Sequence, residues 1–410
     1  MPCAENKNYN SANIRASLCF GTFFAIIFLI STDFEVLDLV NYRNAEKKDR
    51  CEIIDLMNYV FKVDFEKVLP KTFNDNYEFE NITKVAENEN GRLVAEVCVL
   101  PQQVAVGDFS LDTNFLGGVT VHPRYRGQNH MITLIGMWLD EMKDHCDMSV
   151  LGGLRQRYEH FGYTSGGIQW EYIVNVHNIK HGLKDISSEK LCIVPLEQIA
   201  DGFAFAAELN NSKNVNVYRD ADNTDKIMVC YRQHPFGVVE EGRIIGYIVT
   251  SLDREKISEF ALQDSKDTKR VLKAYFEHFE TEKVTVVLPD YETELHRELL
   301  TFAESGQSGP CCNFNIFNFA KVVRAYLELK NKTCRLSHGR FSAVMDNQPI
   351  TVTIDEKGVS VESKADDDAV VLDKLSAQQL LLTHAGRYTD IDVPADWFPL
   401  PLFWYKVDQY

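Results

Sequence analysis

The stretch Gly118-Val-Thr-Val-His-Pro-Arg-Tyr-Arg-Gly-Gln-Asn-His-Met131 decides how the first part of this chain folds. Its β-branched beginning predicts a strand that splays from its neighbour, and the residues from Met131 onward predict a helix. The turn between them is rich in backbone N–H groups, is flanked by arginines and contains no carboxylate. Such a turn at a helix N-terminus favours an anion, so we predict that it holds the pyrophosphate of a phosphorylated carrier.

The residues after the turn have the periodicity of a helix with one apolar face. Apolar side chains recur at three- and four-residue spacing, at Met131, Leu134, Ile135, Trp138, Leu139 and Met142. This pattern predicts a helix that packs on a sheet. Before the turn, the runs 93–100 and 115–121 predict two neighbouring strands, and we expect the second to carry the arm of the carrier.

A second motif, Arg157-Tyr-Glu-His-Phe-Gly-Tyr163, follows the predicted helix. Together the two motifs resemble the GNAT superfamily of acetyl-CoA-dependent N-acetyltransferases, whose turn usually reads R-x-x-G-x-G/A. When Arg126 is aligned with the arginine of this motif, Asn129 stands at the first glycine position and Met131 stands at the position of the small residue. Asn is the non-glycine residue that best tolerates a positive φ, so that replacement preserves the turn.

The other register starts at Arg124 and places Gly127 at the first glycine and Asn129 at the last position. In both registers the resemblance implies that acetyl-CoA lies along the second strand, with its pyrophosphate on the amides of the turn. The expected cofactor-binding residues are Val119, Thr120, Val121, Arg124, Arg126, Gly127, Gln128, Asn129, His130 and Met131.

Tyr158 matches the tyrosine that lies near the CoA sulfur in GNAT enzymes. A phenol, with a pKa of about 10, can protonate a departing thiolate whose thiol has a pKa of about 8.5. The resemblance therefore implies that Tyr158 is the catalytic acid. Alternatively, Tyr158, Phe161 and Tyr163 form only a packed aromatic cluster.

Composition indicates a globular chain of two or three domains, because 45% of its 410 residues are hydrophobic. The ten cysteines show no CxxC spacing and the eleven histidines no HExxH pattern, so we predict a reducing, cytoplasmic location and no catalytic metal.

Sixty acidic residues against forty-three basic ones give a net charge of −17, which argues against nucleic acid as a partner. An acidic body would attract a cationic amine such as a polyamine or an aminoglycoside, although surplus acid also serves solubility alone.

The N-terminal residues 1–37 form a hydrophobic extension with an uncharged run at 18–30. This run suits a signal-peptide core better than a bilayer span, which needs about 20 residues. A membrane anchor is a second interpretation. A third, which we favour, is that translation begins near Leu37 or Leu39, so membrane contact is expected only if the extension is real.

Three domains are expected after the extension, and together they predict a mixed α+β fold class. Residues 38–180 form the catalytic GNAT fold, which begins with a strand at 38–44 and a helix at 45–61 and ends after a strand at 169–176. In residues 181–308, strands at 229–232, 236–239, 242–249 and 284–288 and a helix at 267–279 repeat that order. The segment 261–265 has neither arginine nor glycine, so this second GNAT-like domain is predicted to lack CoA.

Residues 309–410 are similar to a sterol-carrier-protein-like module. A buried helix is expected from Asn313, paired strands at 348–354 and 358–362, and another helix from Leu375 with Ser376 as its cap. The three units in tandem resemble the Eis (enhanced intracellular survival) class of acetyltransferases. That resemblance implies a homo-oligomer, such as a hexamer.

The final residues 396–410 are too apolar for a free tail and are expected to dock into the protein. In Eis-class enzymes the terminal α-carboxylate is the base that accepts a proton from the amine, which assigns that role to Tyr410. An α-carboxylate has a pKa of about 3.5 and is therefore ionised. Alternatively, the tail only covers a hydrophobic patch.

We therefore predict direct acetyl transfer from acetyl-CoA to a primary amine of a small cationic substrate. Two other functions remain open. One is a non-catalytic carrier of lipids or other hydrophobic ligands with a degenerate acyl-CoA-sensing domain. The other is an acetyltransferase that acts on a lysine of a protein or peptide.

Overall fold

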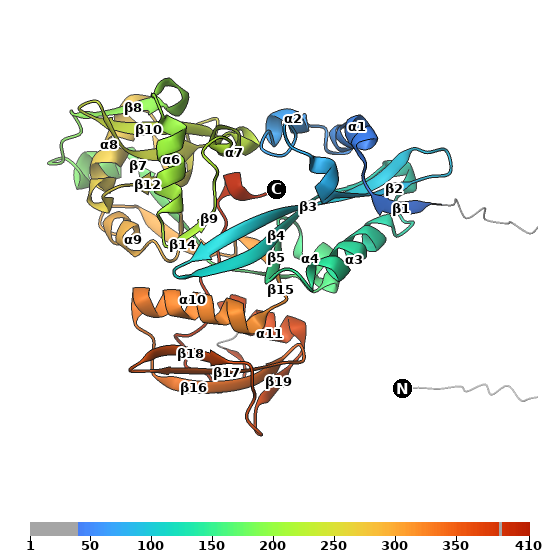
Figure 1. Cartoon of the computed structure of the whole chain (residues 1–410). Coiled ribbons are helices and arrows are strands. Elements are labelled where there is room, and N and C mark those ends of the chain that lie inside the picture. The colour runs from blue at the N-terminus through green and yellow to red at the C-terminus, as the bar shows by residue number, and fades with distance from the viewer. Residues whose placement is uncertain (1–39, 385–387) are drawn as a thin grey trace, which may run out of the picture. The chain divides into compact units, whose positions relative to one another are not determined.

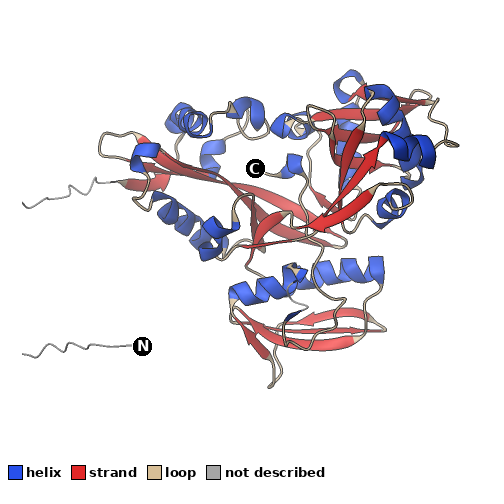
Figure 2. Ribbon diagram, turned by 180° about the vertical axis from the view of Figure 1, so that it is seen from behind, coloured by secondary structure: helices blue, strands red, loops and turns tan. Residues whose placement is uncertain are grey.

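The computed structural model describes residues 40–384 and 388–410, which form three sheets with helices packed against them. This is the mixed α+β class that the sequence predicts, and Figure 2 shows strands and helices in all three parts. The hydrophobic extension 1–37 lies outside the described residues. No helix in the described ranges is both long and apolar enough to cross a membrane.

The first sheet is built mainly from the predicted catalytic region. Its strands, in spatial order, are β1 (Asn41–Asn44), β2 (Thr83–Glu87), β3 (Leu93–Val106), β4 (Phe109–Val121), β5 (Met148–Leu151), β15 (Cys312–Ile316) and β6 (Thr164–Gly166), with β9 (Val215–Val217) paired to β3. β3 and β4 form the long hairpin in Figure 1, which confirms the two neighbouring strands. β4 and β5 are parallel but pair only between residues 113–116 and 148–151. β5 ends at Leu151, so β4 has no strand partner on this side beyond Leu116.

Helices cover both faces of this sheet. On one face, α1 (Arg50–Phe61) packs with Cys98 and Leu100 of β3, and the short α2 (Phe65–Val68) follows it. On the other face, α3 (His130–Met142) buries the predicted apolar stripe against alternate residues of β3. Trp138 fixes this contact, because its Nε1 donates to the carbonyl of Val97 at 2.9 Å.

The second sheet contains most of the elements predicted for residues 181–308. Its strands, in spatial order, are β14 (Ser305–Gly309), β7 (Gln169–Asn175), β13 (Lys283–Pro289), β12 (Lys256–Leu262), β11 (Arg243–Thr250), β10 (His234–Glu240) and β8 (Leu191–Pro195). Its helices are α5 (Val176–Gly182), α6 (Gly202–Asn211), α7 (Thr224–Met228), α8 (Thr268–Phe279) and α9 (Thr293–Leu299).

Two assignments in this region differ from the sequence prediction. β7, expected as the last strand of the first domain, pairs with β13 and β14 of the second sheet. The expected strand at 229–232 is instead a helical turn, Cys230–Arg232, in which Tyr231 and Arg232 have φ values of 56° and 58°. A strand needs negative φ angles, so these two residues end any extended run.

The third sheet has the spatial order β18 (Gly358–Glu362), β17 (Gln348–Asp355), β16 (Gly339–Met345) and β19 (Val370–Leu372). β17 and β18 are the two strands predicted to pair, and α10 (Phe319–Cys334) and α11 (Lys374–Leu382) cover one face (Figure 1). Asp373, not Ser376, caps α11, because its carboxylate accepts from the Ser376 amide at 2.8 Å.

The predicted helix from Asn313 begins only at Phe319, where Asn318 caps it. Residues 312–316 form β15, which is inserted between β5 and β6 of the first sheet. All five residues of β15 are buried, which is typical of a central strand. The chain therefore returns to its first sheet after completing the second.

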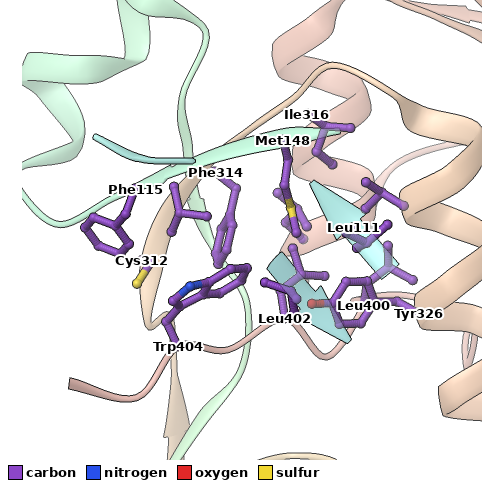
Figure 3. Close-up of a cluster of buried hydrophobic side chains, with 14 of the residues drawn as sticks. Leu111, Phe115, Met148, Cys312, Phe314, Ile316, Tyr326, Leu400, Leu402 and Trp404 are labelled. Atoms are coloured by element: carbon purple, nitrogen blue, oxygen red, sulfur yellow. The ribbon is translucent and has the colours of Figure 1, made fainter. Parts of the chain in front are cut away.

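The C-terminal tail docks into the protein, as its apolar sequence predicts. Figure 3 shows Leu400, Leu402 and Trp404 packed with Phe314 of β15 and Met148 of β5. All five side chains are at most 1% exposed. Further along the tail, Lys406, Gln409 and Tyr410 line a cavity beside β4 and the loop after β5.

Candidate active site

The turn before α3 has the geometry that an anion requires. Gly127 and Asn129 have φ values of 84° and 63°, and both face solvent. The left-handed conformation of Asn129 confirms that it takes a glycine-like position in the turn. No described residue accepts a hydrogen bond from the N–H groups of 127–129, and the N–H groups of the first helical turn have no partner within a helix. These amides are therefore free to bind an anion at a positive helix end.

A cavity of about 520 Å³ lies over this turn and is called the cofactor cavity below. Seven of the ten predicted cofactor-binding residues line it: Val119, Val121, Arg126, Gly127, Asn129, His130 and Met131. The other lining residues are Val60, Phe61, Tyr125, Ile132 and Arg157, which the sequence prediction did not include. Arg157 lies directly before Tyr158 in the quoted second motif, so the motif itself contained the signal for this second arginine.

Three predicted residues do not line the cofactor cavity: Thr120, Arg124 and Gln128. Thr120 is fully buried, and its hydroxyl donates to the Gly118 carbonyl at 3.0 Å. Gln128 instead contacts His130, whose other ring nitrogen contacts the Tyr42 hydroxyl at 2.8 Å. Burial lowers the pKa of His130, so its neutral ring is structural and its backbone is the part available to a ligand.

A second cavity, of about 560 Å³, continues from the cofactor cavity along β4 and is called the acceptor cavity below. The two cavities share Phe61, Val119 and Arg157. The acceptor cavity is lined by both predicted catalytic residues, Tyr158 and Tyr410. Residues 252 positions apart in the chain thus meet at one site.

Tyr158 ends the short helix α4 (Arg155–Tyr158) and is 6% exposed. Gly153 has a φ of 138°, and a Cβ atom placed there would lie 2.8 Å from the Tyr158 ring. The glycine therefore lets the loop after β5 pass close to the phenol. Burial raises the pKa of Tyr158, so the phenol is protonated at neutral pH and can donate a proton.

Tyr410 lies against a β-bulge in β4. Glu96 pairs with Thr120 whereas Cys98 pairs with Gly117, so β4 has one residue more than β3 in this interval. A Cβ atom at Gly117 would lie 2.0 Å from the Tyr410 ring, and one at Gly118 would lie 2.7 Å from its hydroxyl. The two glycines thus make the space that the terminal side chain fills.

The terminal carboxylate of Tyr410 is held by Tyr231, whose hydroxyl donates to it. Tyr231 belongs to the helical turn that replaces the expected strand, and it also lines the acceptor cavity. Burial raises the pKa of the Tyr410 phenol well above its ordinary value, so the carboxylate is the charged group of this residue.

Three side chains, those of Lys71, Gln102 and Arg219, hold the tail in place. Lys71 Nζ donates to the carbonyls of Val407 and Gln409 at 2.7 and 2.5 Å. The Gln102 side chain donates to the Asp408 carbonyl at 2.6 Å. The Asp408 carboxylate accepts from Arg219 at 2.8 and 3.0 Å. The position of the last residue is therefore determined by Lys71, Gln102 and Arg219 together.

The corresponding end of β12 in the second sheet has a different chemistry. The turn before α8 places Asp264 and Asp267 at the start of that helix, where an anion would be repelled. This arrangement agrees with the absence of arginine and glycine from 261–265. His177 and His181 stack on α5 with ring centroids 6.5 Å apart, but the described residues hold no group of three or more potential metal ligands.

Residues 41–166 match the family described as the acetyltransferase (GNAT) domain. No curated protein sequence matches the chain. Among solved structures, a probable N-acyltransferase from Enterococcus faecalis V583 is similar over 88% of this chain and 95% of its own, at 16% identity and a TM-score of 0.62. A GCN5-related N-acetyltransferase from Anabaena variabilis is similar over 91% and 100%, at 15% identity and a TM-score of 0.61.

Eis1 from Mycobacterium abscessus is similar over 91% of this chain and 100% of its own, at 9% identity and a TM-score of 0.58. At these identities the likeness concerns the fold, and it extends over the three sheets described above. The family match adds the chemistry of the first sheet: the chain carries a GNAT domain at residues 41–166 and is an acetyltransferase.

Proposed function

We propose that this enzyme transfers an acetyl group from acetyl-CoA directly to a primary amine. The GNAT fold uses acetyl-CoA, and the free amides of the turn at 126–131 suit its pyrophosphate. One observation carries the proposal. The unpaired edge of β4 leads from that turn into a cavity lined by Tyr158 and by the terminal residue Tyr410.

In the proposed reaction the nitrogen of the amine attacks the thioester carbonyl, so that a C–N bond forms and the C–S bond breaks. The Tyr410 carboxylate accepts one proton of the ammonium group before the attack, and Tyr158 donates its phenolic proton to the departing thiolate. The second proton that the nitrogen loses restores the Tyr158 phenol, so the net release is one proton, which leaves from the carboxylate. Amides of β4 beyond Leu116, which do not pair with β5, stabilise the charge that develops on the carbonyl oxygen. No covalent intermediate with the enzyme is required.

The identity of the amine, the assembly of the protein and the nature of its third domain remain predictions from the sequence. A small cationic substrate is one proposal for the acceptor, and a lysine of a protein or peptide is another. A sterol-carrier-like module and a hexamer are proposed from the Eis resemblance alone. Light scattering on the purified full chain would determine the assembly.

Two variants test the mechanism. Tyr158→Phe should lower kcat about 10²- to 10⁴-fold, the usual contribution of a general acid, with little change in CoA affinity. Deletion of Gln409 and Tyr410 should also remove turnover, because it removes the proposed base. Thiol release from acetyl-CoA measures turnover, and calorimetry with CoA measures binding.

The two measurements separate the alternatives. A hydrophobic-ligand carrier would release no thiol with any amine, whether or not its sensing domain binds acyl-CoA. Full turnover of the truncated chain would exclude the terminal carboxylate as base, and full turnover of Tyr158→Phe would exclude the phenol as acid.

A further inference from the structure

The acceptor cavity has an apolar wall. Its residues come from the end of α1, from α2 and from the segments that adjoin α2: Phe61, Val63, Phe65, Val68 and Leu69. At the mouth, Phe61 and Leu154 are 44% and 65% exposed. Exposed apolar side chains that surround a concave site indicate that an apolar ligand covers them.

The charged groups that line this cavity also indicate which ligand it binds. The charged side chains that line it are Arg157 and Lys406, and none of its described lining residues is Asp or Glu. Glu96 lies buried within the sheet on β3, and burial raises its pKa well above the ordinary value, so it is neutral. Asp408 is already paired with Arg219. The terminal carboxylate of Tyr410 is therefore the negative group that this cavity offers to a substrate.

Lys406 gives the cavity a positive charge near that carboxylate. Its ammonium lies 3.7 Å from the centre of the Tyr231 ring, and the Tyr231 hydroxyl contacts the carboxylate. Lys406 Nζ also donates to Gln409 Oε1 at 3.4 Å. An ammonium group at the carboxylate is thus favoured, whereas a second one nearby would meet Lys406 or lose its hydration against apolar side chains.

From this arrangement we propose that the acceptor is a primary amine with a single positive charge and an apolar body, rather than a polyamine or an aminoglycoside. The inference rests on the proposed function, because it assumes that the acceptor amine enters this cavity. The net charge of −17 does not oppose it. Charge over the whole surface accelerates encounter with any cation, whereas the lining of the cavity determines which one binds.

A matched pair of substrates tests the proposal. Hexylamine and 1,6-diaminohexane have the same carbon chain and differ in one terminal ammonium group. The full-length enzyme should acetylate hexylamine with a kcat/KM at least about tenfold higher, since burying or repelling the second charge costs 1.4 kcal/mol or more. Spermidine should be a poorer substrate than either.

A variant at Lys406 tests the cause of the preference. Lys406→Glu should reduce the preference for hexylamine at least about tenfold, because an attractive carboxylate replaces a repulsive ammonium. Lys357→Glu makes the same change of charge at an exposed position in the third sheet's β17–β18 turn and should leave the ratio unchanged. Calorimetry of both amines with the enzyme–CoA complex should give the same order of affinities.

The outcomes are distinguishable. Equal or better use of 1,6-diaminohexane or spermidine would overturn this inference and leave the acetyltransferase mechanism intact. An unchanged ratio in Lys406→Glu would overturn the role of Lys406. Binding of CoA without thiol release for any amine would overturn the proposed function and this inference with it.

Discussion

Two adjacent residues, Tyr231 and Arg232, have left-handed backbone angles although neither is glycine. Such conformations cost of order 1 kcal/mol each and persist only where the surrounding structure requires them. Here the turn directs the Tyr231 hydroxyl to the terminal carboxylate of Tyr410. A phenol that donates to a carboxylate stabilises its ionised form. Tyr231 is therefore a positioning residue that also keeps the proposed base deprotonated.

Tyr231→Phe should raise the pKa of the terminal carboxylate, because it removes a hydrogen bond to the charged form. A hydrogen bond of this kind contributes about 1.5–3 kcal/mol to the stability of the charged form. The base must be ionised to act, so the acidic limb of the kcat/KM–pH profile should move to higher pH. Turnover at pH values where the base is fully ionised should change less than turnover at lower pH.

Tyr218→Phe is the matched control, since Tyr218 is 64% exposed and lies outside the acceptor cavity. A uniform loss of turnover at every pH in Tyr231→Phe would contradict the electrostatic role and indicate a loss of structure instead.

Single residues show what local sequence can and cannot predict. The positive φ of Asn129 follows from its place in a recognised motif, and the structure confirms it. The role of Tyr231 was missed because its partner lies 179 residues later in the chain and its neighbours are apolar enough to suggest a strand. No local periodicity encodes such a contact.

Among the elements, β4 and the tail depend on each other through the bulge at Gly117 and Gly118. The bulge opens the strand, and the Tyr410 ring fills the space beside it. Any side chain at Gly117 competes directly with that ring.

Gly117→Ala should expel the Tyr410 ring and lower kcat/KM at least about tenfold, since small displacements of a catalytic group are costly. The new Cβ atom would lie 2.0 Å from the ring, and Gly117 does not have a positive φ, so the clash with the tail is the direct effect. Steady-state thiol release measures the change.

Gly136→Ala is the control for this variant. Gly136 lies within α3, and a Cβ atom there would meet nothing within 4 Å. This variant should keep full activity and gain about 0.5–1 kcal/mol in unfolding free energy, because alanine favours a helix. Full activity of Gly117→Ala would show that the docked ring is dispensable.

Long, strongly periodic elements such as α3, α8 and the β3–β4 hairpin follow from the sequence because their patterns extend over several turns or alternations. β15 does not. Its five buried residues run almost directly into the buried face of α10, so strand and helix share one apolar pattern. Which sheet receives β7 or β15 is decided by pairing between distant segments, which periodicity does not specify.

Over the whole molecule, a buried ion-pair triad joins the tail to the second sheet. Arg219 is 1% exposed and contacts Asp408 of the tail and Glu259 of β12, each at 2.8 Å. Burial would raise the pKa of Glu259, but the Arg219 charge outweighs it, so the pKa is lowered. Two buried carboxylates thus share one buried guanidinium group.

Arg219→Met should lower the unfolding free energy by about 3–5 kcal/mol, because it leaves two carboxylates buried without their cation. In the parent protein the folded pKa of Glu259 lies below its ordinary value of 4.5. The stabilising effect is therefore complete above that pH and is lost as the pH falls through the folded pKa. In Arg219→Met the carboxylates are destabilised when charged, so acid should relieve part of the loss.

Thermal unfolding between pH 4 and pH 8 measures both effects, with Arg243→Met at an exposed site on β11 as the control. A loss below about 1 kcal/mol in Arg219→Met, or a parallel pH dependence in both proteins, would contradict the argument.

The sequence predicts three units in order along the chain, but it does not predict that they depend on one another. The sequence places each domain in one continuous segment, whereas β15 belongs to the first sheet and comes from residues 312–316. Hydrogen bonds between remote segments, such as Lys71 to Val407, make the tail part of the first domain as well. Contacts of this kind cannot be predicted from the sequence pattern of either segment alone.

The return of β15 to the first sheet has a consequence for biosynthesis. During translation, residues 40–166 leave the ribosome long before residue 316 is made. The β5 edge of the first sheet therefore stays without its partner β15 while roughly 150 further residues are synthesised. An open strand edge is a template for pairing with another chain. Recombinant fragments that stop at residue 166 should therefore aggregate, and in the cell this interval is where a chaperone would be needed.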